Sequence, residues 1–185
     1  TELGVFADFK PDIPRKWRET PFVFLANIDP ELQLDVLKQV KSPRLVACDT
    51  MDYWIKGKPD ALRKLLKKVD ALVINDEEVR MLGGHPSLLK SARAVRRMGP
   101  RWLIVKQGEY GALLFTELGV FSAPALLLEN VKDPTGAGDT FAGGFMGVLA
   151  KAGRINDDIF RQAVIMGSVM ASFAVEDFSI RKLAK

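Results

Sequence analysis

The sequence predicts a layered α/β domain with a largely parallel sheet, and three observations predict it. Short apolar runs of strand length alternate with longer segments of helical periodicity. The spacing of these runs leaves room for a helix between neighbouring strands, as parallel pairing requires. The composition fits one such domain, because 185 residues with 48% hydrophobic and 27% charged residues can bury a sizeable core.

The first half of the chain predicts alternating strands and helices. Residues 21–27 form an apolar run typical of a buried strand. Asp29 and Pro30 then fit the N-cap and first position of a helix over 31–40. We expect the following elements to be a strand over 44–50, a helix over 57–69, a strand over 71–75 and a helix opening over 76–82. Residues 1–9 have the apolar composition of a strand without a start signal, so we expect upstream sequence to be missing.

The second half continues the alternation. A helix over 87–98 follows a Gly-Gly-His-Pro break, and residues 102–115 predict two strands around a glycine-containing turn. We then expect a strand over 119–128, a helix ending near 151 and a long helix from about 157 to 173. Ligands of such sheets bind beyond the carboxyl ends of strands. The polar residues at strand ends are therefore candidates for a site: Asn27, Asp49, Asn75, Lys106 and Asp133.

Composition excludes several classes of function. The single Cys48 forms no internal disulfide or paired-cysteine zinc site, which favours a reducing, cytoplasmic setting. The single His85 excludes a His-pair metal site and disfavours a Ser-His-Asp triad. The net charge of +4 is scattered at helical spacing, which indicates solvated helix faces rather than nucleic-acid binding and suits an anionic small substrate. The longest apolar run, 163–175, is shorter than a membrane span, so no membrane is expected.

The segment KDPTGAGDTFAGGF, residues 132–145, predicts an anion site. Successive small residues expose the amides of Gly136, Ala137 and Gly138 where a helix begins, and its dipole adds positive potential. The segment lacks the lysine of an ATPase loop, and Phe141 breaks the dinucleotide fingerprint. Asp139 either stabilises the helix as a first-turn acid or accepts the proton of a hydroxyl group during phosphoryl transfer.

Residues Asp133 to Phe141, with Ala142-Gly143-Gly144 behind them, resemble the C-terminal signature of the ribokinase-like (PfkB) carbohydrate kinase family. The resemblance implies a ribokinase-like three-layer α/β/α fold and ATP-dependent transfer of the γ-phosphoryl group to a hydroxymethyl of a sugar or nucleoside. It implies that Asp139 is the catalytic base. The family's anion hole would be formed by the amides of Gly136, Ala137 and Gly138, and the monovalent-cation site would lie by Asp133 and Thr135.

Two further motifs stand in the family's order. Asn75 and Glu78 resemble the NxxE motif, which helps to place Mg²⁺ and the triphosphate, although a capping box explains the same letters. Lys106, Gly108 and Gly111 resemble the strand-end turn that approaches the nucleotide phosphates, and an ordinary glycine turn is the alternative.

The segment 163–175 resembles the family helix that borders adenine. Its small residues Gly167, Ser168 and Ala171 leave room for a flat ring, and we expect Ser168 to line the base pocket; a packed core helix is the alternative. The family usually carries a glycine shortly after this helix, where this chain has Val175-Glu-Asp-Phe-Ser179, so K⁺ dependence stays open. Asp49 fits a plain strand-end cap better than a metal or phosphate role.

The resemblance covers only the C-terminal part of the family pattern. We therefore expect residues 1–185 to be the nucleotide-binding and catalytic part of an N-terminally truncated kinase domain that lacks the first strands and the lid. Exposed strand edges would favour a homo-oligomer or pairing through an exposed sheet edge. The acceptor is left open among ribose, fructose phosphates, nucleosides and other alcohols. A non-catalytic nucleotide-binding module or inactive kinase fragment is the second hypothesis, and an oxidoreductase dinucleotide fold is disfavoured by the missing fingerprint.

Overall fold

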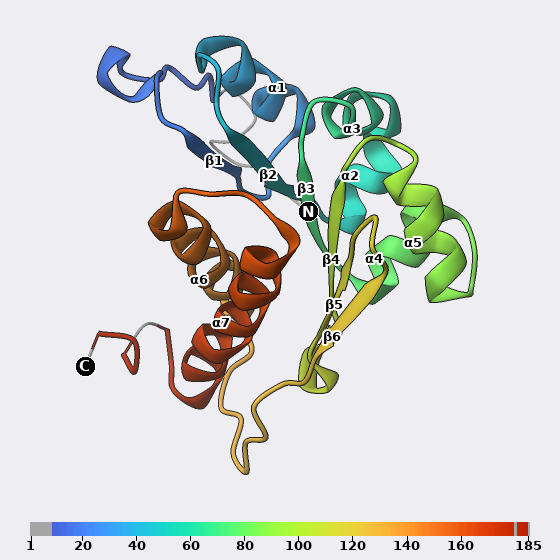
Figure 1. Cartoon of the computed structure of the whole chain (residues 1–185), viewed down its shortest axis with the longest axis vertical. Helices are drawn as coiled ribbons and strands as arrows, with labels where there is room; N and C mark the ends of the chain where they lie inside the picture. Colours follow the sequence, from blue (N-terminus) through green and yellow to red (C-terminus); the bar gives the residue numbers. More distant parts are fainter. Residues whose placement is uncertain (1–8, 180, 185) are drawn as a thin grey trace. The chain divides into compact units, whose positions relative to one another are not determined.

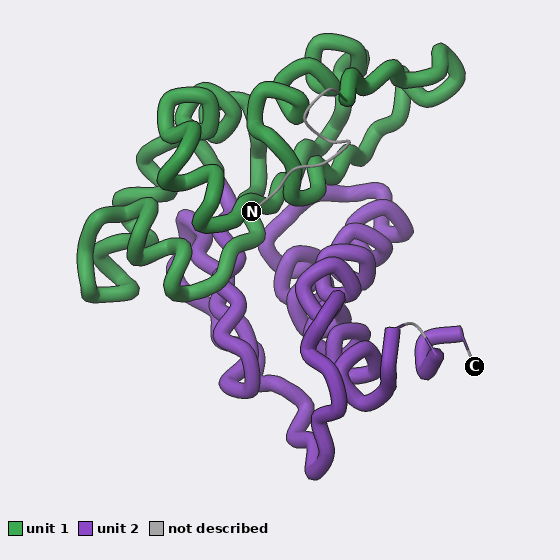
Figure 2. Tube along the Cα trace, turned by 180° about the vertical axis from the view of Figure 1, so that it is seen from behind, with its two compact units in different colours: residues 1–100 green, residues 101–185 purple. Residues whose placement is uncertain are grey.

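The computed structural model describes residues 9–179 and 181–184 and divides into two compact units. Figure 2 shows unit 1, Thr1–Pro100, and unit 2, Arg101–Lys185, in different colours. Strands alternate with helices over residues 22–96, and a run of three strands followed by two helices completes the chain, which confirms the predicted α/β class. The strand expected over 1–9 lies, except for residue 9, outside the described residues.

The strands of unit 1 are parallel. They are β1 (Phe22–Leu25), β2 (Leu45–Asp49) and β3 (Ala71–Asn75), in the places that the sequence predicts. Phe22 lies opposite Leu45, and Ala47 lies opposite Ala71. Every residue of β2 and the first four residues of β3 are buried, the pattern of strands covered on both faces.

Local signals fix most helix starts in unit 1. Asp29 caps α1 (Pro30–Gln39), its carboxylate accepting a hydrogen bond of 2.9 Å from the amide of Glu31. The helix expected over 57–69 is α3 (Pro59–Leu66), and a separate helix, α2 (Asp52–Gly57), precedes it. The two are separated at Lys58, whose ψ of 51° is not helical, because a residue before proline is kept out of the helical region. The remaining elements are η2 (Arg15–Trp17), α4 (Asp76–Gly83) and α5 (Leu88–Arg96).

The strands of unit 2 form an antiparallel meander of β4 (Trp102–Lys106), β5 (Ala112–Phe115) and β6 (Val120–Ala123). Leu103 lies opposite Phe115, and Ala112 lies opposite Ala123. The connections are too short for a crossover, so these strands turn back on one another. The strand expected over 119–128 ends at Ala123, because Pro124 lacks the amide that would continue the ladder.

Helices α6 (Ala137–Ala152) and α7 (Asp157–Glu176) lie side by side in unit 2 (Figure 1). Aromatic rings hold α6, α7 and β4 together: the Trp102 and Phe160 rings stack with centroids 4.2 Å apart, and Phe145 meets Phe160 edge-on at 5.5 Å. Trp102 Nε1 also donates a 2.8 Å hydrogen bond to Asp157 Oδ1 at the start of α7.

One helix among the described residues, α7, is long and apolar enough to cross a membrane, with a mean hydropathy of 1.3 over its apolar window. The apolar run 163–175, from which no membrane span is expected, is only part of this helix, which extends over 20 residues. Ile159, Phe160 and Val164 on α7 are buried. Because buried core helices pass the same test of length and composition, α7 alone is only a weak indication of a membrane.

Candidate functional site

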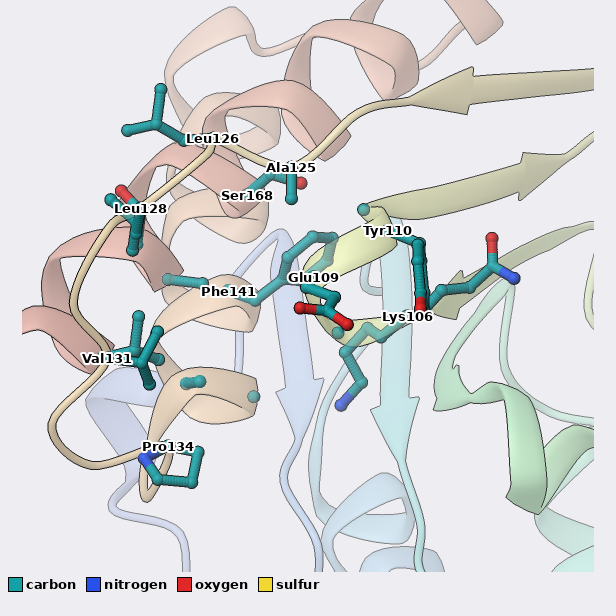
Figure 3. Close-up of a pocket in the computed structure, with 18 of the residues that line it drawn as sticks. Lys106, Glu109, Tyr110, Ala125, Leu126, Leu128, Val131, Pro134, Phe141 and Ser168 are labelled. Atoms are coloured by element: carbon teal, nitrogen blue, oxygen red, sulfur yellow. The ribbon is translucent and has the colours of Figure 1, made fainter.

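Unit 2 contains a cavity of about 790 Å³ (Figure 3), a volume typical of small-molecule sites. Its walls come from the turn after β4, the loop after β6, the start of α6 and one side of α7. Much of the lining is apolar, contributed by Leu126, Leu127, Leu128, Val131, Phe141 and Val175. The exposed fractions of Leu126 and Leu127, 54% and 92%, show that this wall is open to solvent.

One end of the cavity is polar, where Lys106 meets the first turn of α6. A Cβ built on Gly138 would lie 3.1 Å from Lys106 Nζ, so the amine lies directly against this turn. In Figure 3 the Lys106 side chain extends away from Ser168, toward this end of the cavity. The ammonium group and the helix N-terminus both contribute positive potential, so this end of the cavity suits an anion.

The start of α6 leaves backbone donors available. Gly136 is the N-cap with φ +81°, a left-handed conformation that glycine adopts freely, and no side chain caps the helix. The amide of Ala137 donates to Pro134 O at 3.2 Å. Among the described residues, no protein acceptor takes the amides of Gly138 or Asp139. Of the three amides expected to form an anion hole, that of Ala137 is thus bonded within a turn, whereas those of Gly136 and Gly138 have no acceptor among the described residues.

Asp139 lies in the first turn of α6 and is exposed. It is absent from the lining of the cavity, although Gly138 and Phe141 on either side of it contribute. Its side chain is therefore in contact with solvent, one residue after Gly138.

Asp133 and Thr135 interact with each other in the loop before α6. The amide of Thr135 donates a 2.9 Å hydrogen bond to Asp133 Oδ1. Hydrogen bonds from the Thr135 side chain, and then from its amide, hold the pKa of Asp133 below its usual value of 3.8. The described residues contain no group of three or more His, Cys, Asp or Glu side chains that could hold a metal ion.

Asn75 and Glu78 belong to unit 1 and form a capping box at the start of α4. Asn75 Oδ1 accepts a 2.8 Å bond from the amide of Glu78, and Glu78 Oε2 accepts a 3.0 Å bond from the amide of Asn75. Asn75 and Glu78 therefore form the capping box that their spacing predicts. A role of these residues with Mg²⁺ stays a prediction.

Gly108, Gly111 and Ser168 all line the cavity of unit 2. Gly111 has φ +96°, and a Cβ there would lie 2.1 Å from Ala123 O, so the close approach of β6 by itself requires glycine. Gly108 has φ +57° and open space where a Cβ would be. Ser168 reaches the cavity from α7, beside Ala171.

Two parts of the cavity wall were missed from the sequence. The sequence predicts that the strand continues to residue 128, whereas residues 125–128, together with Val131, form the open apolar wall. Pro124 is the signal that could have ended the strand there. Glu109, in the turn η3 (Gly108–Tyr110), also lines the cavity. The neighbouring residues in the sequence do not indicate that this side chain belongs to a ligand site.

Comparison with known proteins identifies the class of protein that this fold and site define. The sequence pattern described as "pfkB family carbohydrate kinase" matches residues 21–183, and the chain belongs to this family. A cytidine kinase of Thermococcus kodakarensis is 30% identical over 138 residues, which cover 72% of this chain and 49% of that protein. A nucleoside kinase of Methanocaldococcus jannaschii is 26% identical over 157 residues, covering 85% of this chain and 49% of that protein.

Solved structures agree on the fold. The crystal structure of the M. jannaschii nucleoside kinase, a member of the ribokinase family, superimposes with a TM-score of 0.74 at 25% identity, covering 94% of this chain and 54% of that one. The structure of a putative ribokinase II from Escherichia coli, in complex with ATP and Mg²⁺, superimposes with a TM-score of 0.73 at 19% identity. The match covers 90% of this chain and 56% of that one. The ribokinase-like α/β fold is thus confirmed, and the chain spans about half the length of the curated relatives it matches.

Proposed function

We propose that this chain is the nucleotide-binding and catalytic part of an ATP-dependent kinase that phosphorylates a hydroxymethyl group of a sugar or nucleoside. One observation carries the proposal: open amides at the start of α6 and the Lys106 amine lie together at one end of a cavity of nucleotide size. The exposed Asp139 stands in the same helical turn.

The lining of the cavity fits ATP. The amide of Gly138 and the amine of Lys106 would hold phosphate oxygens, with Gly108 leaving space for them. The apolar wall and the small residues Ser168 and Ala171 would hold the flat base. ATP supplies the phosphoryl group, and Mg²⁺ would neutralise charge on the phosphates.

The ion sites are proposed from the residue types present. Carboxylate and amide oxygens suit Mg²⁺, which usually keeps several waters, so Glu78 and Asn75 can assist while retaining their capping hydrogen bonds. Asp133 and Thr135 would lie by a monovalent cation such as K⁺. A carboxylate whose pKa is lowered stays ionised and available to a cation at neutral pH.

Asp139 would act as general base. Its carboxylate orients the acceptor hydroxyl and takes its proton, while the amide of Gly138 and the Lys106 ammonium stabilise the charge on the transferring group. Phosphoryl transfer has a loose transition state, in which the proton leaves late, so the reaction does not require a strong base.

The relatives support a nucleoside or sugar acceptor, because the matching proteins include a cytidine kinase and a nucleoside kinase. The second candidate is a nucleotide-binding module without catalysis, favoured by the fact that the chain spans about half of each of these relatives. The two candidates differ in phosphoryl transfer and agree on ATP binding.

The deciding experiment uses the product of the complete gene and compares Asp139→Asn with wild type, using a panel of cytidine, ribose and fructose. The matched control is Asp158→Asn, an exposed first-turn acid of α7 that pairs with Arg161 at 3.1 Å. We expect Asp139→Asn to lose about 10²-fold or more in phosphoryl transfer, the usual contribution of a general base. ATP binding should persist, and the control should behave like wild type. Equal transfer by Asp139→Asn and wild type would refute the role of Asp139.

A homo-oligomer, or pairing through an exposed sheet edge, is also part of the proposal, together with a cytoplasmic location. In unit 2, β6 presents Val120 with an exposed fraction of 52%. Sedimentation of wild type and a Val120→Lys variant would test pairing through this strand, since a charge on an edge strand opposes association. A monomeric wild type would contradict it.

A further inference from the structure

Glu109 brings a negative charge into a cavity that otherwise suits an anion. Among the described residues that line the cavity, it has the only carboxylate, and Lys106 has the only ammonium group. No described residue donates a hydrogen bond to the Glu109 side chain, so its carboxylate oxygens are available to a ligand.

The position of Glu109 is set by a tightly bonded turn. The amide of Tyr110 donates to Gln107 O at 3.1 Å, and the amide of Gln107 donates to Gly111 O at 2.8 Å. Gly111 in turn packs against Ala123 O, which holds the end of the turn to β6. The backbone that carries Glu109 is therefore well anchored, although its side chain is exposed.

The carboxylate occupies the middle of the cavity. Figure 3 shows it beside Phe141, with the Lys106 amine on one side and Ser168 on the other. A nucleotide with its phosphates at Lys106 and Gly138 and its base near Ser168 has its sugar in this middle section. A carboxylate facing phosphate would be repelled, whereas one facing a sugar accepts hydrogen bonds from adjacent hydroxyls.

We propose that Glu109 recognises the 2′- and 3′-hydroxyls of the donor nucleotide and thereby selects ribonucleotides over deoxyribonucleotides. This inference rests on the proposed binding of ATP in the cavity. Both hydroxyls donate to an acceptor that has no other donor, so loss of either hydroxyl removes a hydrogen bond to a charged group.

The test measures binding by calorimetry, with ATP, 2′-deoxy-ATP and 3′-deoxy-ATP as ligands. The variants are Glu109→Ala and Glu109→Gln. The control is Glu117→Ala, an exposed acid of the same unit that lies 3.7 Å from Arg101 and does not line the cavity. Thermal melts would verify that all variants fold.

We expect wild type and Glu117→Ala to bind ATP about tenfold more tightly than either deoxynucleotide, as one charge-assisted hydrogen bond allows. Glu109→Ala should bind all three ligands with the weaker affinity, and Glu109→Gln, which keeps one acceptor oxygen, should discriminate less than wild type. Discrimination that survives in Glu109→Ala would overturn the inference while leaving the proposed function intact. A wild type that binds none of the three would overturn the proposed function itself.

Discussion

Gly167 on α7 is the point at which replacing a hydrogen atom by a methyl group should disturb the packing of α6 and α7. A Cβ at this position would lie 2.9 Å from Phe141 O and 3.0 Å from two atoms of the Phe141 ring. Phe141 is buried and lines the cavity one helical turn after the proposed anion site. Gly167→Ala therefore forces Phe141, and the first turn of α6 with it, to shift.

Two opposing effects set the magnitude. Overpacking a well-packed core costs about 1–3 kcal/mol, while replacing glycine within a helix by alanine returns about 0.5–1 kcal/mol. Because one of the contacts is with a backbone oxygen, which rotamer changes cannot relieve, we expect the overpacking to prevail. The net loss should be about 1 kcal/mol, and the melting temperature should fall by about 2–4 °C.

Gly147→Ala on α6 is the matched control, since a Cβ there meets nothing within 4 Å. Its free energy of unfolding should rise by about 0.5–1 kcal/mol, because alanine is favoured over glycine within a helix and the added methyl group overpacks nothing. Urea and thermal unfolding followed by circular dichroism would measure both variants. If Gly167→Ala proves as stable as Gly147→Ala, the close approach of the two helices does not limit the packing, and the reasoning is refuted.

Three further predictions concern single side chains. Asn75→Ala removes the cap of α4 and should lower the stability by about 1 kcal/mol in urea; an unchanged midpoint would contradict the capping role. Because the pKa of Asp133 is lowered in the folded protein, its stabilising contribution is present above the unfolded value near 3.8 and disappears as the pH falls through the folded pKa. Thr135→Val removes the side-chain hydrogen bond, which is the largest cause of the lowered pKa, and should raise the pKa of Asp133 in an NMR titration. A titration curve identical to that of wild type would show that this hydrogen bond does not lower the pKa. Burial and then the charge of Asp49 raise the pKa of the Cys48 thiol, so Ellman's reagent at pH 8 should react only after unfolding; fast reaction with the native protein would show the thiol to be accessible.

The features that depend on neighbouring residues could be predicted from the sequence. Asp29 and Pro30 start α1, Asn75 and Glu78 form the capping box that their spacing indicates, and α6 begins at the glycine-rich segment. These features follow from local backbone bonding, which the order of residues determines directly.

The rest depends on tertiary contacts. The strand expected to run to residue 128 stops at Ala123, and the apolar residues beyond it form a cavity wall instead. Apolar periodicity alone does not distinguish a buried strand from the wall of a ligand site. Glu109 enters the cavity only because its turn is packed against β6, and no local pattern carries that information.

The amides of Gly138 and Asp139 are the groups on which the proposed chemistry depends, and their NMR signals can be followed directly. Titration of ¹⁵N-labelled protein with a non-hydrolysable ATP analogue should move both amide proton signals downfield, because each gains a phosphate acceptor. Adenosine, which lacks phosphates, should move the signals near Ser168 and leave these two in place. If the analogue shifts Ser168 to saturation while both amide signals stay unchanged, the phosphate binds elsewhere and the assignment of the anion site is wrong.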